Sequence, residues 1–259
     1  MSFLYGGDFM IEAIFFDVDG TLVPFGMERI PENTLKTLNA LREKGVKLFV
    51  ATGRPPCAID HVKALFDFDG YLTANGQYCF DKQGHVIFEQ YISESSVKQL
   101  LPYVEENKIP TLYATVESCY RNKYVVEDYD LRWPKADDTT ATKPMLQVMA
   151  TISPSEDEEF VKHLPGTKPL RWTDGFADVI SQSGGKDAGI DHMIAYYGIQ
   201  LENVMAIGDG ANDIPMLEHV HYSVAMGNAS DIVKKSASYV TDESQNDGIT
   251  KACKHFEIL

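Results

Sequence analysis

The sequence predicts an α/β protein with a doubly wound, mostly parallel sheet and an inserted α+β segment. Apolar strand-like runs alternate with helical segments near both ends of the chain, whereas shorter strand-like pieces fill the region between about residues 84 and 183. Acidic clusters directly follow two of the apolar runs, as expected at the ligand-binding edge of a parallel sheet. The 259 residues suffice for one large domain or two modest ones.

The first elements predict a βαβ unit. Residues 11–16 (IEAIFF) are a short apolar run that ends at Asp17, which is typical of a buried parallel strand. A helix is expected over residues 31–44, because leucines recur at helical spacing and Gly45 follows the last turn. Residues 46–51 (VKLFVA) predict a second strand. The short links between these elements favour a right-handed crossover.

The same alternation returns near the C-terminus. We expect a helix over about 186–197, a strand over 204–207, a helix around 212–218 and a strand over 222–225. These elements are expected to complete one sheet with the N-terminal unit, so the segment between them is an insert.

The insert is expected to be an α+β unit of its own. Its strand-like pieces lie at 85–90, 111–116, 145–152, 170–173 and 177–181, and its amphipathic stretches at 95–106 and 155–164. Turn-forming residues flank it on both sides. The expected division of the chain is an α/β core over 10–83 and 184–259, an insert over 84–183, and an unstructured extension over residues 1–9.

Composition excludes several classes of partner and location. The 38 acidic and 23 basic residues give a formal net charge of −15, the wrong sign for binding a nucleic-acid backbone. No apolar stretch approaches the roughly 18 residues of a membrane span, and the first basic residue is Arg29, so no secretory signal is expected. The four cysteines form no Cys-x-x-Cys pair, which fits a reducing cytoplasm. We expect a cytoplasmic protein without nucleic-acid or membrane partners, and its oligomeric state stays open.

The strongest chemical signal is the pair of aspartates after the first strand. Asp17 and Asp19 lie two positions apart and are followed by Gly20 and Thr21, so a glycine-containing turn holds two carboxylates at the sheet edge. An acidic turn without function is the alternative for a bare Asp-x-Asp pair. The preceding apolar strand and the Gly-Thr-Leu that follows favour a functional site.

A second acidic cluster follows the strand over 204–207. Asp209 and Asp213 lie between that strand and the next helix, where an aspartate alone could serve only to begin the helix. Together, the two clusters bring four aspartates to the ends of neighbouring strands. Like charges this close raise one another's pKa or require a cation. Oxygen ligands without cysteine favour a hard divalent ion, Mg²⁺ before zinc.

Two further residues fit a phosphate site. The hydroxyl of Thr52, at the end of the second strand, can donate to a phosphoryl oxygen. Lys186, at the start of a predicted helix, can neutralise charge on both phosphate and carboxylate. Each is a weak signal alone, and the combination favours phosphoryl chemistry.

In combination, these motifs resemble the haloacid dehalogenase superfamily, and within it the Cof-type bacterial phosphatases with a type IIB cap. The four family motifs occur in order, at residues 17–21 (DVDGT), 52–54 (TGR), Lys186 and 208–213 (GDGAND). Residues 71–76 (YLTANG) are similar to the family's hinge-side loop. The resemblance covers nearly everything from Met10 onward. It implies a Rossmann-like core with the insert as the cap.

The resemblance also implies a reaction and a set of residues. The implied activity is Mg²⁺-dependent hydrolysis of small phosphorylated metabolites, above all sugar phosphates, through an aspartyl-phosphate. Asp17 is the implied nucleophile and Asp19 the implied general acid and base. The implied metal ligands are Asp17, Asp19 through its main-chain carbonyl, Asp209, and Asp213 directly or through water. Thr52 and Lys186 are implied catalytic residues, and the implied substrate-binding residues are Thr52, Gly53, Arg54, Asn75, Lys186 and Asn212.

Two other functions stay open at this point. Related type IIB proteins include phosphomannomutases, so a sugar phosphomutase is one alternative. A non-catalytic phospho-aspartate switch that resembles receiver domains is the other. The presence of Asp19 and the size of the insert disfavour the switch.

Three other patterns have structural explanations. Residues 67–70 (DFDG) repeat the acidic motif but follow a helical pattern and lack the threonine, so a structural turn is expected. His219 and His221 have no evident third ligand and are expected at the surface or near the site without binding metal. Asn228 begins a glycosylation sequon, which has no meaning in a cytoplasmic protein.

Overall fold

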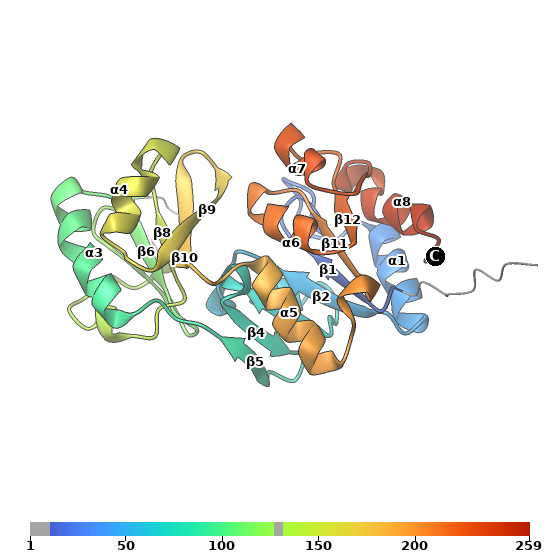
Figure 1. Cartoon of the computed structure of the whole chain (residues 1–259), viewed down its shortest axis with the longest axis horizontal. Helices are drawn as coiled ribbons and strands as arrows, with labels where there is room; N and C mark the ends of the chain where they lie inside the picture. The colour runs from blue at the N-terminus through green and yellow to red at the C-terminus, as the bar shows by residue number, and fades with distance from the viewer. Residues whose placement is uncertain (1–10, 127–131) are drawn as a thin grey trace, which may run out of the picture.

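A computed structural model describes residues 11–126 and 132–259 and contains two sheets, each in its own body (Figure 1). The expected extension over residues 1–9 lies outside the described residues. We call the part around the eight-stranded sheet the larger body and the part around the five-stranded sheet the smaller body.

The sheet of the larger body has the strand order β13-β12-β11-β1-β2-β3-β4-β5. The strands from β13 to β3 are parallel, and β4 and β5 add an antiparallel edge. The strands are β1 (Ala13–Phe16), β2 (Lys47–Ala51), β3 (Gly70–Thr73), β4 (Tyr78–Asp81), β5 (Val86–Glu89), β11 (Val204–Gly208), β12 (Tyr222–Ala225) and β13 (Tyr239–Val240).

Helices cover both faces of this sheet. Alternate residues of β1 face opposite ways, so Phe16 packs with one group of helices and Phe15 with the other. Burial on both faces explains why the strands are continuously apolar. The first group is α1 (Glu32–Glu43), α2 (Asp60–Lys63) and α8 (Gly248–His255), and the second is α5 (Lys186–Tyr197), α6 (Ile214–His219) and α7 (Asp231–Lys235).

The smaller body is an antiparallel sheet of order β7-β6-β8-β10-β9 with two helices on one face. Its strands are β6 (Thr111–Ala114), β7 (Cys119–Arg121), β8 (Gln147–Ala150), β9 (Thr167–Thr173) and β10 (Phe176–Ser181), and its helices are α3 (Glu94–Asn107) and α4 (Asp157–Lys162). Tyr113 and Val148 face the helices, whereas Leu112 and Met149 face the other way, toward the larger body.

The chain passes between the two bodies twice, over residues 90–93 and 182–185. The two connections lie side by side, because the Gln90 side-chain amide donates hydrogen bonds to the hydroxyls of Ser181 (2.8 Å) and Ser183 (2.6 Å). Each connection runs from a strand of one body to a helix of the other.

The predicted fold class is confirmed: a mostly parallel α/β sheet accompanies a separate α+β insert. Of residues 85–90, expected in the insert, Val86–Glu89 instead form β5 at the edge of the larger sheet. The turn residues before them close a β4–β5 hairpin, in which the Asp81 carboxylate accepts the main-chain N–H groups of Gln83 (2.9 Å) and His85 (2.8 Å). The expected division at residues 83 and 183 stays a prediction.

Among the described residues, no helix has the length and apolar character to cross a bilayer.

Candidate active site

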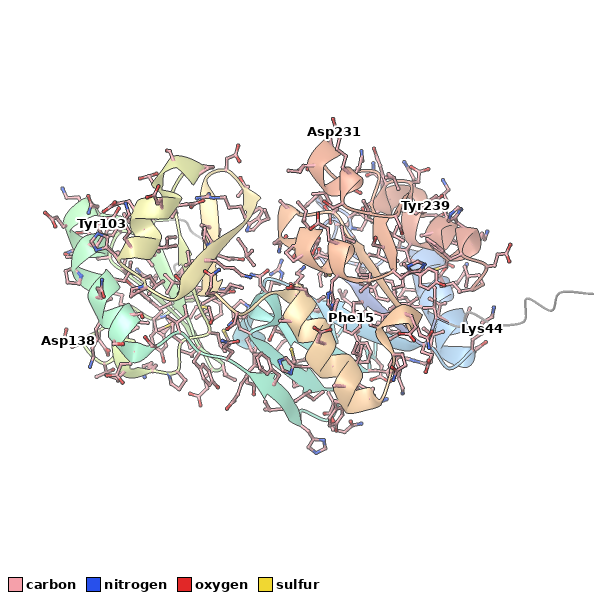
Figure 2. All side chains as sticks on the ribbon, in the orientation of Figure 1. Phe15, Lys44, Tyr103, Asp138, Asp231 and Tyr239 are labelled. Atoms are coloured by element: carbon pink, nitrogen blue, oxygen red, sulfur yellow. The ribbon has the colours of Figure 1, made fainter. Side chains whose placement is uncertain are left out.

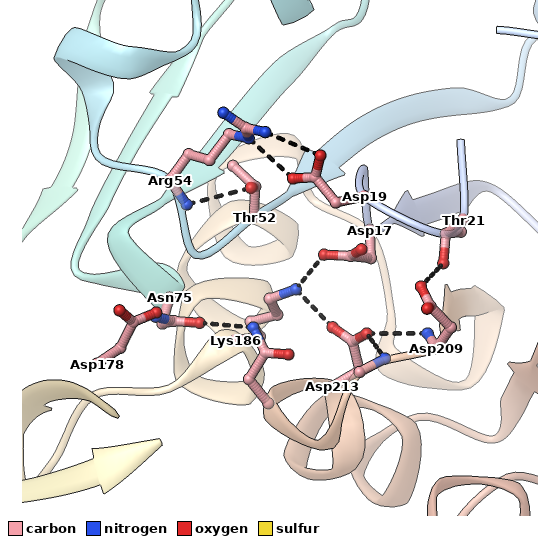
Figure 3. Close-up of polar contacts among 12 residues, drawn as sticks. Asp17, Asp19, Thr21, Thr52, Arg54, Asn75, Asp178, Lys186, Asp209 and Asp213 are labelled. Carbon is pink, nitrogen blue, oxygen red and sulfur yellow. Dashed lines mark hydrogen bonds and ion pairs between the residues drawn. The ribbon is translucent and has the colours of Figure 1, made fainter. Parts of the chain in front are cut away.

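The candidate site lies where three neighbouring parallel strands end (Figure 3). Asp17 follows β1, Thr52 follows β2 and Asp209 follows β11. Because β1 lies between β2 and β11 with its last residue, Phe16, beside Val50 and Ile207, the residues that follow all emerge at one edge. This is the edge at which open α/β sheets bind ligands.

Three buried carboxylates gather at this edge around one ammonium group. Oxygen atoms of Asp17, Asp209 and Asp213 all lie within 4.8 Å of one another. The Nζ of Lys186, which is fully buried at the start of α5, donates to Oδ1 of Asp17 (2.6 Å) and to Oδ1 of Asp213 (2.5 Å). Of the four aspartates predicted to meet, three therefore lie together around Lys186, and the Asp19 side chain lies outside this group.

The electrostatics of the cluster favour a bound cation. Burial raises the pKa of Asp17, and the neighbouring Asp213 carboxylate raises it further. Burial also raises the pKa of Asp209 to about 7. Burial alone would lower the pKa of Lys186, but its ion pairs with Asp17 and Asp213 outweigh it and keep the ammonium protonated. One ammonium facing three carboxylates leaves a surplus of negative charge, which a divalent cation fits.

The loop after β11 holds its acidic residues by its own main chain. Oδ2 of Asp213 accepts the N–H groups of Asp209 (3.0 Å) and Gly210 (2.9 Å), so Oδ1 is turned toward Lys186. The hydroxyl of Thr21 donates to Oδ1 of Asp209 (2.7 Å), which joins the first acidic motif to the last.

Asn228, on the loop after β12, fixes the other oxygen of Asp209. Its amide donates to Oδ2 of Asp209 and to the main-chain carbonyl of Gly20, both at 3.0 Å. The sequence signals this residue only as a sequon, and a single asparagine has no spacing that predicts such a contact. Its position after a strand of the parallel sheet is the one signal that could have indicated it.

Gly20 lets the first motif approach the last. Its φ is +92°, and a Cβ atom at this position would lie 2.2 Å from Oδ2 of Asp209. Both the backbone conformation and the space therefore require glycine.

The second aspartate of the first motif has a different environment. The side chain of Asp19 lies outside the cluster of three carboxylates and forms a two-pronged ion pair with Arg54, in which Nε and one terminal nitrogen each donate at 2.8 Å. The hydroxyl oxygen of Thr52 accepts the N–H of Arg54 (3.2 Å). Asp19 is half exposed, whereas Asp17 is buried, so the two carboxylates suit different roles.

Asn75 links the two bodies beside the acidic cluster. It lies in a short 3₁₀ turn, η2 (Ala74–Gly76), with a left-handed φ of 53°. Its Nδ2 donates to Oδ2 of Asp178 on β10 (3.0 Å), and its Oδ1 accepts the amide of Asn212 (3.1 Å). The predicted substrate-binding residues Asn75 and Asn212 thus contact each other, and Asp178 joins them from the smaller body.

Two residues of the smaller body were not among the predicted site residues. The Gln147 amide on β8 donates to the main-chain carbonyl of Gly53 (3.0 Å). Asp178 is 5% exposed, and its burial raises its pKa to about 6. Each is a single polar residue within a strand, and nothing in the sequence marks either as facing the larger body.

Asp69 of the second Asp-x-Asp motif and His219 make their contacts outside the acidic cluster. Oδ2 of Asp69 accepts the main-chain N–H of Leu48 (3.0 Å), and Oδ1 pairs with Lys47 (3.1 Å), so the second Asp-x-Asp motif stabilises a turn. His219 pairs with Asp191 (2.7 Å). Within residues 11–126 and 132–259, neither histidine of the pair belongs to a cluster of metal-ligating side chains.

Comparisons with known proteins point to one family. A family model described as haloacid dehalogenase-like hydrolase matches residues 14–253. The Bacillus subtilis protein YkrA is 30% identical over 256 residues, which cover 96% of this chain and 98% of YkrA. The 5-amino-6-(5-phospho-D-ribitylamino)uracil phosphatase YcsE of B. subtilis is 26% identical over 251 residues, covering 96% and 97%. The solved structure of BT4131, a subclass IIB sugar phosphatase, matches with a TM-score of 0.89 and 38% identity, covering 96% and 100%.

Proposed function

We propose, since the chain belongs to the haloacid dehalogenase-like hydrolases, that it hydrolyses sugar phosphates with Asp17 as the nucleophile and Mg²⁺ as the metal. That the protein is a phosphatase of this family, a phosphoric monoester hydrolase acting on small phosphorylated metabolites, follows from the comparisons. The sugar-phosphate class is supported by the name of BT4131, a sugar phosphatase. The name of YcsE also includes a phosphorylated polyol chain, the ribityl group.

The observation that carries the proposal is the position of Asp17 beside Lys186. A buried carboxylate at a strand end is fixed through Oδ1 by an ammonium group that also holds Asp213. Its other oxygen, Oδ2, is then the atom that attacks phosphorus. Attack forms the aspartyl-phosphate, and water later hydrolyses this acyl phosphate and restores the carboxylate.

The donor set of the cluster fits magnesium. We assign the carboxylates of Asp17, Asp209 and Asp213 as ligands, together with the main-chain carbonyl of Asp19. All are oxygen donors, which hard divalent cations prefer. Bound magnesium supplies positive charge that offsets the carboxylates and the phosphate of the substrate.

Lys186 and Thr52 are assigned to the phosphate itself. The Lys186 ammonium lies in the centre of the buried cluster, where positive charge stabilises the negative charge of the transferring phosphoryl group. The Thr52 hydroxyl accepts the N–H of Arg54, and its own proton is available for a phosphoryl oxygen.

Asp19 is assigned to protonate the leaving alcohol and then to deprotonate water. A carboxylate that accepts two hydrogen bonds from a guanidinium carries no proton. The ion pair with Arg54 must therefore open before Asp19 can act as an acid. We assign Arg54 to the anionic substrate at that stage, which makes release of Asp19 depend on substrate binding.

The smaller body is assigned as a cap that covers the site. Gln147 and Asp178 reach from it to Gly53 and Asn75 at the rim of the acidic cluster. Closure excludes water from the first step, and opening exchanges substrate and product.

The experiment is a panel of hexose and pentose phosphates, assayed for release of inorganic phosphate with Mg²⁺ and with EDTA. We expect hydrolysis that stops in EDTA and returns with Mg²⁺. Asp17→Asn is expected to lose activity by about a thousandfold or more, as loss of a nucleophile does. The matched control is Asp67→Asn in the second Asp-x-Asp motif, whose exposed carboxylate pairs with Arg42 and Lys82 at the surface and whose change leaves activity intact.

Each competing result has a distinct readout. Activity in EDTA or in Asp17→Asn contradicts the mechanism. Transfer of phosphate between sugar positions without release of inorganic phosphate, under dependence on a sugar bisphosphate, identifies a mutase. A long-lived phosphorylated chain without turnover identifies a switch.

A further inference from the structure

Two cysteine thiols meet across the boundary between the bodies. Cys57 belongs to a short 3₁₀ turn of the larger body, η1 (Pro56–Ala58), and Cys119 begins β7 of the smaller body. Their sulfur atoms are 3.7 Å apart, although the residues are separated by 62 positions in the chain. Neither is part of a disulfide.

The contact follows from the pattern of the smaller sheet. Cys119 pairs with Ala114 of β6, and both pack with Leu112 and Met149 on the face turned toward the larger body. Cys57 packs against this same cluster from the other side of the boundary. Its position is three residues after Arg54, so the thiol pair lies at the rim of the active site.

The two thiols have complementary reactivity. Cys57 is partly exposed, and the hydrogen bond with Cys119 lowers its pKa, with a further contribution from the charge of Arg132. A partly exposed thiol with a lowered pKa can attack a disulfide compound in solution. The buried Cys119 lies where it can then react with the Cys57 sulfur. Cys79 and Cys253 are buried elsewhere, and burial raises the pKa of both thiols.

We propose that Cys57 and Cys119 form a reversible disulfide, by exchange with a low-molecular-weight disulfide, that holds the smaller body against the larger one. The Cys57 thiolate attacks one sulfur of the added disulfide, which forms a mixed disulfide and releases one thiolate. Cys119 then loses its proton and attacks Cys57 Sγ, which releases the second thiolate. The two cysteines lose two electrons and two protons, and the added disulfide gains them as two thiols.

The bond changes what the molecule can do. A disulfide has a sulfur separation of about 2.05 Å, so the two bodies are held at least as close as they are in the structure. If the smaller body is the cap, as we propose, the bridged protein exchanges neither substrate nor product. Formation of the bond itself does not rest on the proposed function, whereas the loss of activity does.

The experiment exposes the full chain to oxidised glutathione at neutral pH and measures phosphatase activity. A second sample is then unfolded in guanidinium chloride so that the buried thiols also react, its remaining thiols are alkylated, and its intact mass and disulfide-linked peptides are measured. We expect a monomer lighter by two hydrogens before alkylation, a linked peptide pair containing Cys57 and Cys119, and alkylation of Cys79 and Cys253 only. Activity falls in proportion to the bridged fraction, and dithiothreitol restores it.

Two variants distinguish the effect of the disulfide on activity from other effects of oxidation. Cys57→Ser and Cys119→Ala each remove the bridge, and Cys57→Ser changes only a partly exposed position outside the catalytic machinery. Both are expected to be as active as the parent in dithiothreitol and to stay active in oxidised glutathione.

Several results overturn the proposal: a mixed disulfide at Cys57 that never converts to the bridge, a bridge between two chains, or a bridged monomer with full activity. A parent protein that is inactive even when reduced refutes the proposed function instead, and the mass measurement then still decides whether the bond forms.

Discussion

Asp178 is a buried carboxyl whose environment disfavours its charge. It lies on β10, 5% exposed, and its carboxylate accepts a hydrogen bond from Asn75 (3.0 Å). Burial raises its pKa from 3.8 to about 6. The folded protein therefore holds a proton that the unfolded chain releases between these two values. The free energy of unfolding therefore falls as pH rises from 3.8 to about 6, and this loss of stability is complete above pH 6.

Asp178→Asn removes this loss of stability, because the amide carries no charge. Its side-chain oxygen can still accept the hydrogen bond from Asn75. At pH 7.5 we expect the free energy of unfolding to rise by about 1 to 3 kcal/mol, and near pH 3.5 we expect almost no change, because the carboxyl is already protonated there. Urea unfolding at both pH values measures the difference. Asp174→Asn, an exposed position in the turn before β10, is the control and shows no pH-dependent gain. An equal effect of Asp178→Asn at both pH values contradicts the charge explanation.

At the scale of residues, the sequence predicted the centre of the site better than its rim. Asp17, Asp209, Asp213 and Lys186 come together because each follows or begins an element whose period is readable in the sequence. Asn228 and the smaller body's contacts were not predictable, because a lone polar side chain in a strand or loop has no period. The roles assigned to the ten predicted site residues stay predictions.

At the scale of elements, the turn before β3 shows what the second Asp-x-Asp motif does. Asp69 joins this turn to the start of β2 through the main-chain N–H of Leu48 and the side chain of Lys47. Its carboxylate thereby sets where β2 and β3 begin to pair. Asp67, two residues earlier, is exposed.

Asp69→Ala should therefore destabilise the fold without touching the chemistry. Loss of a partly buried acceptor of two hydrogen bonds is expected to lower the free energy of unfolding by about 1 to 3 kcal/mol. The value of kcat should stay unchanged at a temperature well below the unfolding transition. Denaturant melts and steady-state kinetics on Asp69→Ala and the control Asp67→Ala measure both. A drop in kcat for Asp69→Ala alone would mean that the motif takes part in catalysis.

Some elements were predicted with their limits and others were missed. The helix over 186–197 and the strand over 222–225 have the predicted limits, because apolar residues and the glycines or polar residues beside them define both ends. The strands β3, β4, β7 and β13 were not predicted. The turn at 81–84 closes a hairpin, and the sequence does not distinguish it from a connection between domains because both use the same residue types.

At the scale of the whole molecule, one face of the smaller sheet makes the contacts with the larger body. Gln147, Asp178 and Cys119 all project from the side opposite α3 and α4. Figure 1 shows both helices on the side of this sheet away from the larger body, and Figure 2 shows Tyr103 of α3 on that outer side. Alternation along the strands places them there, since the intervening residues fill the core beneath the helices.

Gln147→Ala should weaken closure of the proposed cap. It removes two neutral hydrogen bonds, one to the Gly53 carbonyl (3.0 Å) and a longer one from the Asn75 amide (3.4 Å). Together they are worth about 1 to 2 kcal/mol, so we expect kcat/KM to fall about fivefold to thirtyfold with little change in the thermal unfolding of either body. The matched control is Gln99→Ala on α3, where the amide contacts the Lys162 carbonyl within the smaller body (3.3 Å). Steady-state kinetics of both variants measure kcat/KM. Equal values for the two variants would show that the Gly53 contact has no part in turnover.

The presence of two units and their order along the chain could be predicted, but their mutual placement could not. The order of the two units along the chain follows from the change in the pattern of strands and helices near residues 84 and 183. Placement depends on a few side chains of one sheet face meeting η1, η2 and the loop after β2, and no sequence pattern reports contacts between surfaces.

The paired connections at residues 90–93 and 182–185 restrict how the two bodies can swing. An object on one tether turns about any direction, whereas two adjoining tethers leave rotation about the single line that runs through both. Gln90 fastens the pair by bonding Ser181 and Ser183. If the smaller body opens and closes as the proposed cap, this restriction returns Gln147, Asp178 and Cys119 to the same partners each time.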